Sequence, residues 1–326
     1  MRKPKVLPKL IVVVSLIFSI IVLFSHKKTA ALSELDILKG YVDFSDISSE
    51  ESYYETKLRS LEFVPPKKLG ESLNTSHQPQ IAGKIGLLID AKTGNVLFEK
   101  DAYTRKEIAS LVKIMTALVA IEHADLDQLV YISESAARVG ENTMGISAGE
   151  VYTLKELLFG LIMQSGNDSA YAISEGVAGS TEIFVDWMNI KAAELGLTNT
   201  YFADPSGLDD KTYSTAADLA RLTVYALQYP EFREVSTTLE TELISNTHKY
   251  LPLYNQTNLL STYPGVAGVK TGYTEVAGLC LVTYAQNDGR EVVGIVLDSP
   301  DRKGDMILML DHGFSTLGVT INHNLL

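Results

Sequence analysis

The chain has 326 residues, of which 46% are hydrophobic, and its 28 Lys and Arg against 40 Asp and Glu give a net charge of −12. This length is enough for one large domain with an appended segment, and the composition is that of a folded protein. The acidic balance excludes a general attraction to nucleic acid or to an anionic membrane surface, so membrane association would need an inserted segment.

The N-terminus has the pattern of such a segment. Four basic residues (Arg2, Lys3, Lys5 and Lys9) precede an uncharged apolar run over 10–25. We predict that 1–25 is an uncleaved signal anchor, with a cytoplasmic N-terminus and the rest of the chain exported, because no small-x-small cleavage motif follows directly. A cleaved signal, and hence secretion, is the alternative.

Residues 26–80 are expected to form a stalk, because they show little periodicity and contain Pro65-Pro66 and a polar run. A folded domain is expected over 81–320. The single cysteine, Cys280, excludes an intramolecular disulfide, and its apolar neighbours predict a buried thiol.

The domain begins with a predicted hairpin, whose strands 85–90 and 96–100 flank a turn at Thr93-Gly94-Asn95. Helices are expected in the middle of the chain, on the basis of apolar periodicity and of capping residues. Their expected ranges are 110–124, 154–164, 181–195 and about 215–229. The segment from Thr153 to Glu156, at the start of the second, has the form of a capping box.

The last part of the chain is rich in predicted strands, at 266–274, 277–285 and 290–297, followed by a helix over 302–317. Strands at both ends of the domain, with helices between them, predict one sheet assembled from distant parts of the chain. The helices between them would form an inserted subdomain.

Three short motifs occur in order along the domain: Ser110-Leu111-Val112-Lys113, Ser165-Gly166-Asn167 and Lys270-Thr271-Gly272. A serine hydroxyl needs an adjacent base to act as a nucleophile, and Lys113 lies one helical turn from Ser110. A lysine serves as that base only when burial or a nearby cation lowers its pKa, and Lys270 is a candidate for the cation.

Each motif alone is common, and Lys92-Thr93-Gly94 is a second copy of the third one. This copy precedes Ser110 and falls in the predicted hairpin turn, so we interpret it as structural. The order and spacing of the other three motifs are typical of penicillin-binding proteins and class A β-lactamases.

The surrounding sequence resembles the D-alanyl-D-alanine carboxypeptidase family of low-molecular-mass penicillin-binding proteins, serine peptidase family S11. The resemblance extends from about Ile81 to Gly318 and is carried by segments such as IASLVKIMTALVA, YFADPSGLDD and PGVAGVKTGYTEVAG. It implies an α/β fold of the α+β type, with a mostly antiparallel sheet flanked by helices and an inserted all-α subdomain. It also implies a bacterial membrane enzyme whose domain lies on the extracytoplasmic side.

The resemblance implies a role for each motif residue. Ser110 would form an acyl-enzyme, Lys113 would take its proton and Ser165 would relay a proton to the departing D-alanine. The substrate would be a peptidoglycan stem peptide ending in D-Ala-D-Ala, and β-lactam antibiotics would acylate the same serine. Substrate-binding residues implied in this way are Asn167, Lys270, Thr271, Gly272, Tyr273 and Arg302, with the amides of Ser110 and Tyr273 as an oxyanion hole.

The sequence departs from the family at Val112, where threonine is usual, and at Ser206, where histidine is common. The chain also ends at Leu326, so we expect neither the further β-rich domain nor the C-terminal anchor of many relatives. No cofactor is expected. No metal site is expected either, because the six histidines are scattered and lack a metal-ligand spacing.

Two other functions remain open on the sequence alone. A non-catalytic penicillin-sensing or cell-wall-binding module would retain the fold, although such a module would not need the base Lys113. A β-lactamase is less favoured, because we find no glutamate followed closely by Leu-Asn between Asn167 and Lys270 to activate a deacylating water.

Overall fold

The computed structural model describes residues 78–326. Five strands of the described chain form an antiparallel sheet in the order β2-β1-β11-β10-β9. β1 (Ile85–Asp90) lies at the N-terminal end of the domain, yet it pairs with β11 (Arg290–Ser299) at the C-terminal end, from Ile85↔Leu297 to Asp90↔Val292. The prediction of one sheet built from distant parts of the chain is confirmed.

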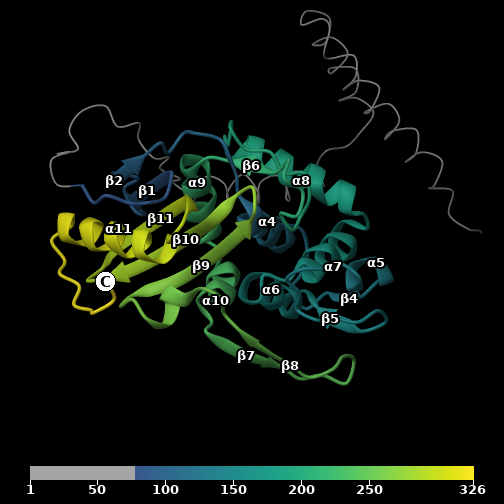
Figure 1. The fold of residues 1–326 in the computed structure, drawn as a ribbon. Coiled ribbons are helices and arrows are strands. Elements are labelled where there is room, and N and C mark those ends of the chain that lie inside the picture. Colours follow the sequence, from purple (N-terminus) through teal and green to yellow (C-terminus); the bar gives the residue numbers. More distant parts are fainter. Residues whose placement is uncertain (1–77) are drawn as a thin grey trace, which may run out of the picture. The chain divides into compact units, whose positions relative to one another are not determined.

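The sheet is covered on both faces by helices. α11 (Arg302–Thr316) packs on β10 and β11, where Met306 and Leu310 enter the core, and it crosses the front of the sheet in Figure 1. α9 (Ala216–Ala226) contacts β1 and β11 from the other side. Strands buried on both faces read as continuous apolar runs, which explains the IGLLID and VVGIVL segments.

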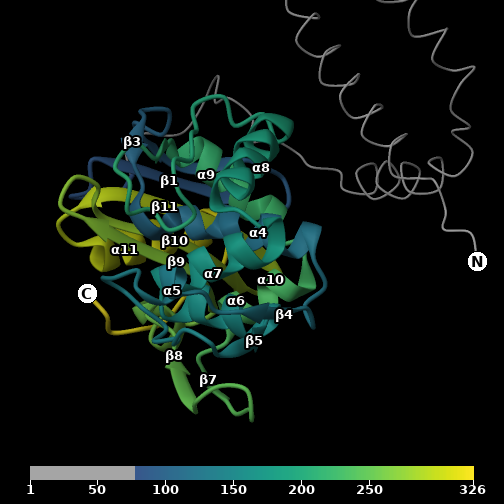
Figure 2. The ribbon, with the colours of Figure 1, turned by 90° about the vertical axis from the view of Figure 1, so that its right-hand side faces the viewer.

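The helical part lies between the two halves of the sheet in sequence, and Figure 2 shows α4, α6 and α7 gathered beside it. It also contains short strands in three two-stranded sheets, β3–β6, β4–β5 and β7–β8, which the sequence analysis did not predict. The elements of this part are β3 (Lys106–Glu107), η3 (Ala109–Val112), α4 (Lys113–His123), β4 (Leu129–Tyr131), α5 (Glu134–Ala137), β5 (Val151–Thr153), α6 (Leu154–Met163), α7 (Asn167–Ala178), α8 (Thr181–Glu194), β6 (Tyr213–Ser214), α10 (Pro230–Thr237), β7 (Glu240–Leu243) and β8 (Leu251–Tyr254).

The remaining elements are β2 (Val96–Lys100), η4 (Asn258–Ser261), β9 (Val266–Thr274) and β10 (Gly278–Asn287). The predicted β1–β2 hairpin is present, and its turn is stabilised by the Asp90 carboxylate, which accepts from the amides of Lys92 and Thr93. Lys92-Thr93-Gly94 therefore lies in this turn, with Gly94 at φ 69°. The copy beside Ser110 is Lys270-Thr271-Gly272.

Local capping residues account for several helix boundaries. The capping box of Thr153 and Glu156 begins α6 as predicted, since each side chain accepts from the other residue's amide. The helix expected over 110–124 differs from the observed structure. Its first turn is the 3₁₀ helix η3, and the α-helix begins at Lys113.

Candidate active site

Ser110 and Lys113 are brought together by the 3₁₀ geometry of η3. Side chains at positions i and i+3 eclipse in a 3₁₀ helix, whereas they are offset in an α-helix. The Lys113 Nζ accordingly lies 2.9 Å from the Ser110 Oγ. Val112, between them, is fully buried and faces the core, which is why a side chain without hydrogen-bonding groups is accommodated there.

Lys113 is fully buried, and its amine meets three oxygen atoms. Nζ donates to Asn167 Oδ1 at 2.7 Å and to the Ser206 carbonyl at 2.6 Å, in addition to its contact with Ser110. Burial lowers the pKa of Lys113 to about 7, against the opposing effect of nearby carboxylates, first that of Asp204. A substantial fraction of Lys113 is therefore neutral near pH 7.

The identity of these three oxygens determines what the neutral amine can do. A neutral amine has two N–H groups and one lone pair. The oxygens of Asn167 and Ser206 are carbonyl oxygens and can only accept, so they take both N–H groups. The lone pair is left for the Ser110 hydroxyl, the one partner of the three that can also donate. The arrangement directs the lone pair of the neutral Lys113 amine at the Ser110 hydroxyl.

The second motif forms a strained turn before α7. Ser165 has φ 57°, an unusual value for a residue other than glycine, and its buried Oγ has no hydrogen-bond partner within residues 78–326. Asn167 begins α7, and its side-chain amide donates to the Gly140 carbonyl while its Oδ1 accepts from Lys113. A buried hydroxyl without a partner is consistent with a group that bonds to a ligand.

The third motif lies on β9, which is the edge strand of the sheet beside η3. Lys270 is buried, and burial together with the charges of Lys113 and Arg302 lowers its pKa well below the ordinary value. A Cβ atom at Gly272 would lie 3.3 Å from the Ser110 amide nitrogen and 3.0 Å from the Ile108 carbonyl oxygen. Glycine at this position thus keeps the space in front of the Ser110 amide open.

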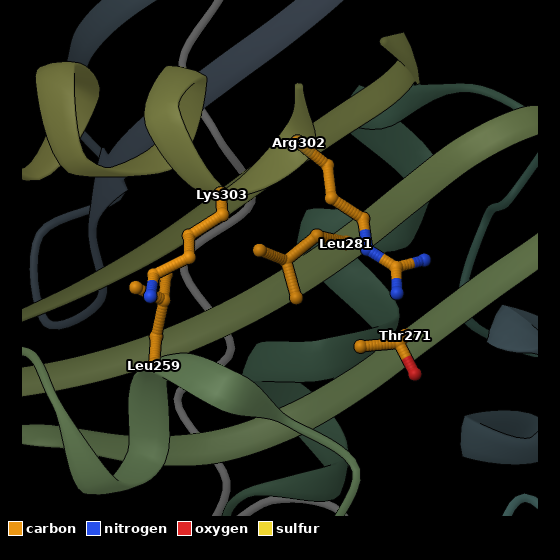
Figure 3. A pocket seen from close by; sticks show the side chains of 5 residues that line it. All are labelled: Leu259, Thr271, Leu281, Arg302 and Lys303. Atoms are coloured by element: carbon orange, nitrogen blue, oxygen red, sulfur yellow. The ribbon is translucent and has the colours of Figure 1, made fainter. Parts of the chain in front are cut away.

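Arg302 and Thr271 border the same small pocket, which Leu259, Leu281 and Lys303 complete (Figure 3). The Arg302 side chain extends toward Thr271, and its Nη1 donates to the Gly272 carbonyl at 2.8 Å and to the Cys280 carbonyl at 3.3 Å. These bonds fix the guanidinium against the strand that carries the third motif. Tyr273, the next residue of β9, has a 60% exposed side chain.

The structure thus brings Ser110 and Asn167 into contact with Lys113, with Gly272 beside Ser110 and Lys270 near Lys113. Cys280 is buried, as predicted, and burial raises the pKa of its thiol to about 11, which disfavours the reactive thiolate. No cluster of three or more His, Cys, Asp or Glu that could hold a metal ion occurs within the described part of the chain.

Two buried carboxylates were missed by the sequence analysis. Asp168 accepts from the amides of Met144, Gly145 and Ser169, and so fixes the loop that faces Asn167. Asp204 fixes the loop that carries Ser206. A sequence signal existed for the second, because Asp204-Pro205-Ser206-Gly207 is a typical turn pattern. The contact of this loop with Lys113, through the Ser206 carbonyl, is tertiary and has no local signal.

Comparison with known proteins places these features in a family. The family model described as D-alanyl-D-alanine carboxypeptidase matches residues 72–301. The D-alanyl-D-alanine carboxypeptidase DacF of Bacillus subtilis is 39% identical over 71% of this chain, which spans 62% of that relative's length. A D-alanyl-D-alanine carboxypeptidase of Streptomyces is 32% identical and is covered over 89% of its length, with 73% of this chain aligned.

Solved structures agree with the sequence relatives. The crystal structure of the Streptomyces K15 DD-transpeptidase superimposes with a TM-score of 0.70 at 32% identity, over 73% of this chain and 99% of that one. The expected fold, a mostly antiparallel sheet flanked by helices with a helical part inserted into it, is confirmed. The chain belongs to the D-alanyl-D-alanine carboxypeptidase family.

Proposed function

We propose that this chain is a serine D,D-carboxypeptidase that removes the terminal D-alanine from peptidoglycan stem peptides. The observation that carries the proposal is the contact of Ser110 with the buried amine of Lys113, whose other two partners can only accept hydrogen bonds. Acyl transfer requires a serine whose hydroxyl faces a neutral base, whereas a module that only binds a ligand does not need that base.

In the first half of the proposed reaction, the Ser110 oxygen attacks the carbonyl carbon of the penultimate D-alanine as its proton moves to Lys113. The developing oxyanion is stabilised by the Ser110 amide, in the space that Gly272 keeps open, and by the amide of Tyr273. The carbon–nitrogen bond then breaks. Ser165 passes its proton to the departing D-alanine nitrogen and regains one from the protonated Lys113, so Lys113 is neutral again and the peptide remains as an ester on Ser110.

In the second half, water attacks the ester carbonyl, and the peptide leaves with a new carboxylate while Ser110 regains its proton. The edge of β9 offers unpaired backbone groups along which an extended peptide can lie. Lys270 and Thr271 lie on β9, and Arg302 bonds to the carbonyls of Gly272 and Cys280; these three residues would bind the terminal carboxylate. A β-lactam, whose ring carbonyl takes the place of the scissile amide, would form the same ester.

The test is D-alanine release from a pentapeptide ending in D-Ala-D-Ala, measured for the wild type and for Ser110→Ala. We expect the variant to lose release and to lose labelling by a fluorescent penicillin. Release that survives in Ser110→Ala would overturn the proposal. Penicillin labelling of Ser110 without any D-alanine release would favour a sensor, and rapid penicillin turnover would favour a β-lactamase.

We also propose an N-terminal membrane anchor and an extracytoplasmic position for the domain, on the basis of the basic and apolar pattern over 1–25. That segment and the stalk predicted over 26–80 lie outside the described residues, except for 78–80. Among the described residues no helix is long and apolar enough to cross a membrane. Fractionation of cells, followed by protease treatment of intact spheroplasts, tests the anchor: the domain should sediment with membranes and be digested.

A further inference from the structure

Lys113 is held by a turn that none of the three motifs contains. The turn runs from Asp204 to Asp209, between α8 and β6, and its Ser206 carbonyl accepts from Lys113 Nζ at 2.6 Å. The same turn contacts the nucleophile segment at Gly207. A Cβ atom there would lie 2.1 Å from the Ala109 carbonyl oxygen and 3.0 Å from the Ser110 amide nitrogen.

The shape of this turn is fixed by the Asp204 carboxylate. Its Oδ1 accepts from the Ser206 amide and hydroxyl, each at 2.6 Å, and from the Gly207 amide at 2.7 Å. Its Oδ2 accepts from the Asp209 amide at 2.8 Å. Asp204 is only 6% exposed, so four donors converge on a carboxylate that is largely withdrawn from water. Loss of these bonds would leave several buried donors without a partner.

The charge of Asp204 also acts on the base. Among the charged groups that face Lys113, Asp204 has the largest effect and raises its pKa, followed by Asp168 and then Glu141, all against the larger lowering by burial. On the sheet side, the pKa of Lys270 is lowered in turn by Lys113. A negative charge in a poorly hydrated environment has a strong effect on a neighbouring amine.

We propose that Asp204 is a positioning residue for the acylation step: its carboxylate shapes the turn that holds both Lys113 and Ser110, and its negative charge favours the protonated form of the Lys113 amine. This inference rests on the proposed function and adds a residue that lies outside the three motifs. Asp204 touches neither the nucleophile nor the space for the substrate, and it acts through Ser206 and Gly207.

The test is the pH dependence of acylation by a fluorescent penicillin, measured on the full-length chain for the wild type and for Asp204→Asn. Asparagine retains an oxygen for the three Oδ1 donors but removes the charge. In the wild type we expect the acylation rate to fall at acidic pH, with the midpoint of this acid limb near pH 7. Because removal of the charge lowers the pKa of Lys113, we expect the acid limb of the variant to lie about one pH unit lower. Replacement of Oδ2 by an amide should also lower the plateau rate.

Asp90→Asn is the matched control. Asp90 is also a 6% exposed carboxylate that holds a turn through backbone amides, but its turn is the β1–β2 hairpin. This variant should retain the wild-type acid limb. A second variant, Thr116→Val, removes the hydroxyl that donates to the Pro205 carbonyl and loosens the Asp204 turn without a change of charge. It should lower the plateau rate and leave the acid limb in place.

A uniform loss of rate at every pH in Asp204→Asn, with an unmoved acid limb, would show a merely structural role and overturn the inference. So would a wild-type profile in this variant. If Asp204→Asn does not unfold cooperatively, it is not properly folded and Thr116→Val becomes the test. An unchanged acylation rate in Thr116→Val would then show that the turn does not position Lys113. A wild type that is not acylated at Ser110 would overturn the proposed function, whereas acylation with an unmoved limb overturns only this inference.

Discussion

Among single residues, Ser165 separates catalysis from stability most clearly. Its buried Oγ has no partner within the described chain, so its removal leaves no other buried group unsatisfied. We expect Ser165→Ala to lower D-alanine release by about 100-fold or more, because proton relay contributes that much. The free energy of unfolding should stay within about 0.5 kcal/mol of the wild type.

Ser174→Ala provides the opposite case for comparison. Ser174 is equally buried, but its hydroxyl bonds to the Tyr171 carbonyl and to Thr181, away from the three motifs. We expect this variant to lose about 1 kcal/mol in urea unfolding and to keep its rate of D-alanine release. Equal effects of the two substitutions on release would contradict the role assigned to Ser165.

At the scale of elements, substitution of Gly207 tests whether the Asp204 turn positions the segment that carries Ser110. Gly207 has φ 85°, and an added Cβ would overlap the Ala109 carbonyl. Gly179, at the end of α7, has φ 74° but nothing within 4 Å of an added Cβ. Gly179→Ala should therefore lose only about 1 kcal/mol from backbone strain. Gly207→Ala should lose more and should also lose most of its acylation rate, as followed by penicillin labelling.

Acylation at the wild-type rate in Gly207→Ala would mean that the contact between the turn and Ser110 is unimportant. A loss of acylation in Gly179→Ala would indicate that backbone strain alone, at a remote helix end, impairs the site. The pair thus distinguishes steric displacement of the nucleophile segment from a general loss of stability.

Elements with a strong local signal were predicted correctly. The β1–β2 hairpin follows from its turn residues, and α6 follows from the capping box of Thr153 and Glu156. α7 was not predicted, because Ser165-Gly166-Asn167 suggests a turn and this turn leads directly into the helix. The 3₁₀ start of the Ser110 helix was also missed, since apolar periodicity hardly distinguishes a single 3₁₀ turn from an α-helical one.

The motif residues and the need for a lowered Lys113 pKa could be inferred from the sequence, but the contacts that surround the amine could not. The lowered pKa of Lys113 depends on burial, and its directed lone pair depends on the Ser206 carbonyl, which is distant in sequence. Asp204 and Asp168 act mainly through backbone amides, and every residue type except proline supplies an amide N–H. Contacts of this kind are set by the fold and are not encoded in side-chain identity.

For the whole molecule, the buried amine links stability to pH. The pKa of Lys113 is about 7 in the folded state and near its ordinary 10.5 in the unfolded state, so unfolding takes up a proton between these values. The contribution of Lys113 titration to the free energy of unfolding is greatest above pH 10.5 and decreases as the pH falls toward 7. Below pH 7 the lysine is charged in both states, and the contribution no longer changes.

Lys113→Met isolates this effect from the other titrating groups. Methionine has a similar length and no charge, so the stability of the variant relative to the wild type should be greater at about pH 6 than at about pH 10, by an amount of the order of a few kcal/mol. This relative stability should fall steadily between the two pH values. Urea unfolding at several pH values measures it, and a difference that does not depend on pH would contradict the lowered pKa.

The pairing of β1 with β11 has a consequence for the order of events in folding. β1 is made early and β11 almost last, yet the central contact of the sheet joins them from Ile85↔Leu297 onward. Contacts between distant parts of a chain form slowly, because a long loop must close before they are gained. During synthesis β1 therefore keeps an unpaired edge and an apolar face until β11 has been made, and the sheet is completed only then.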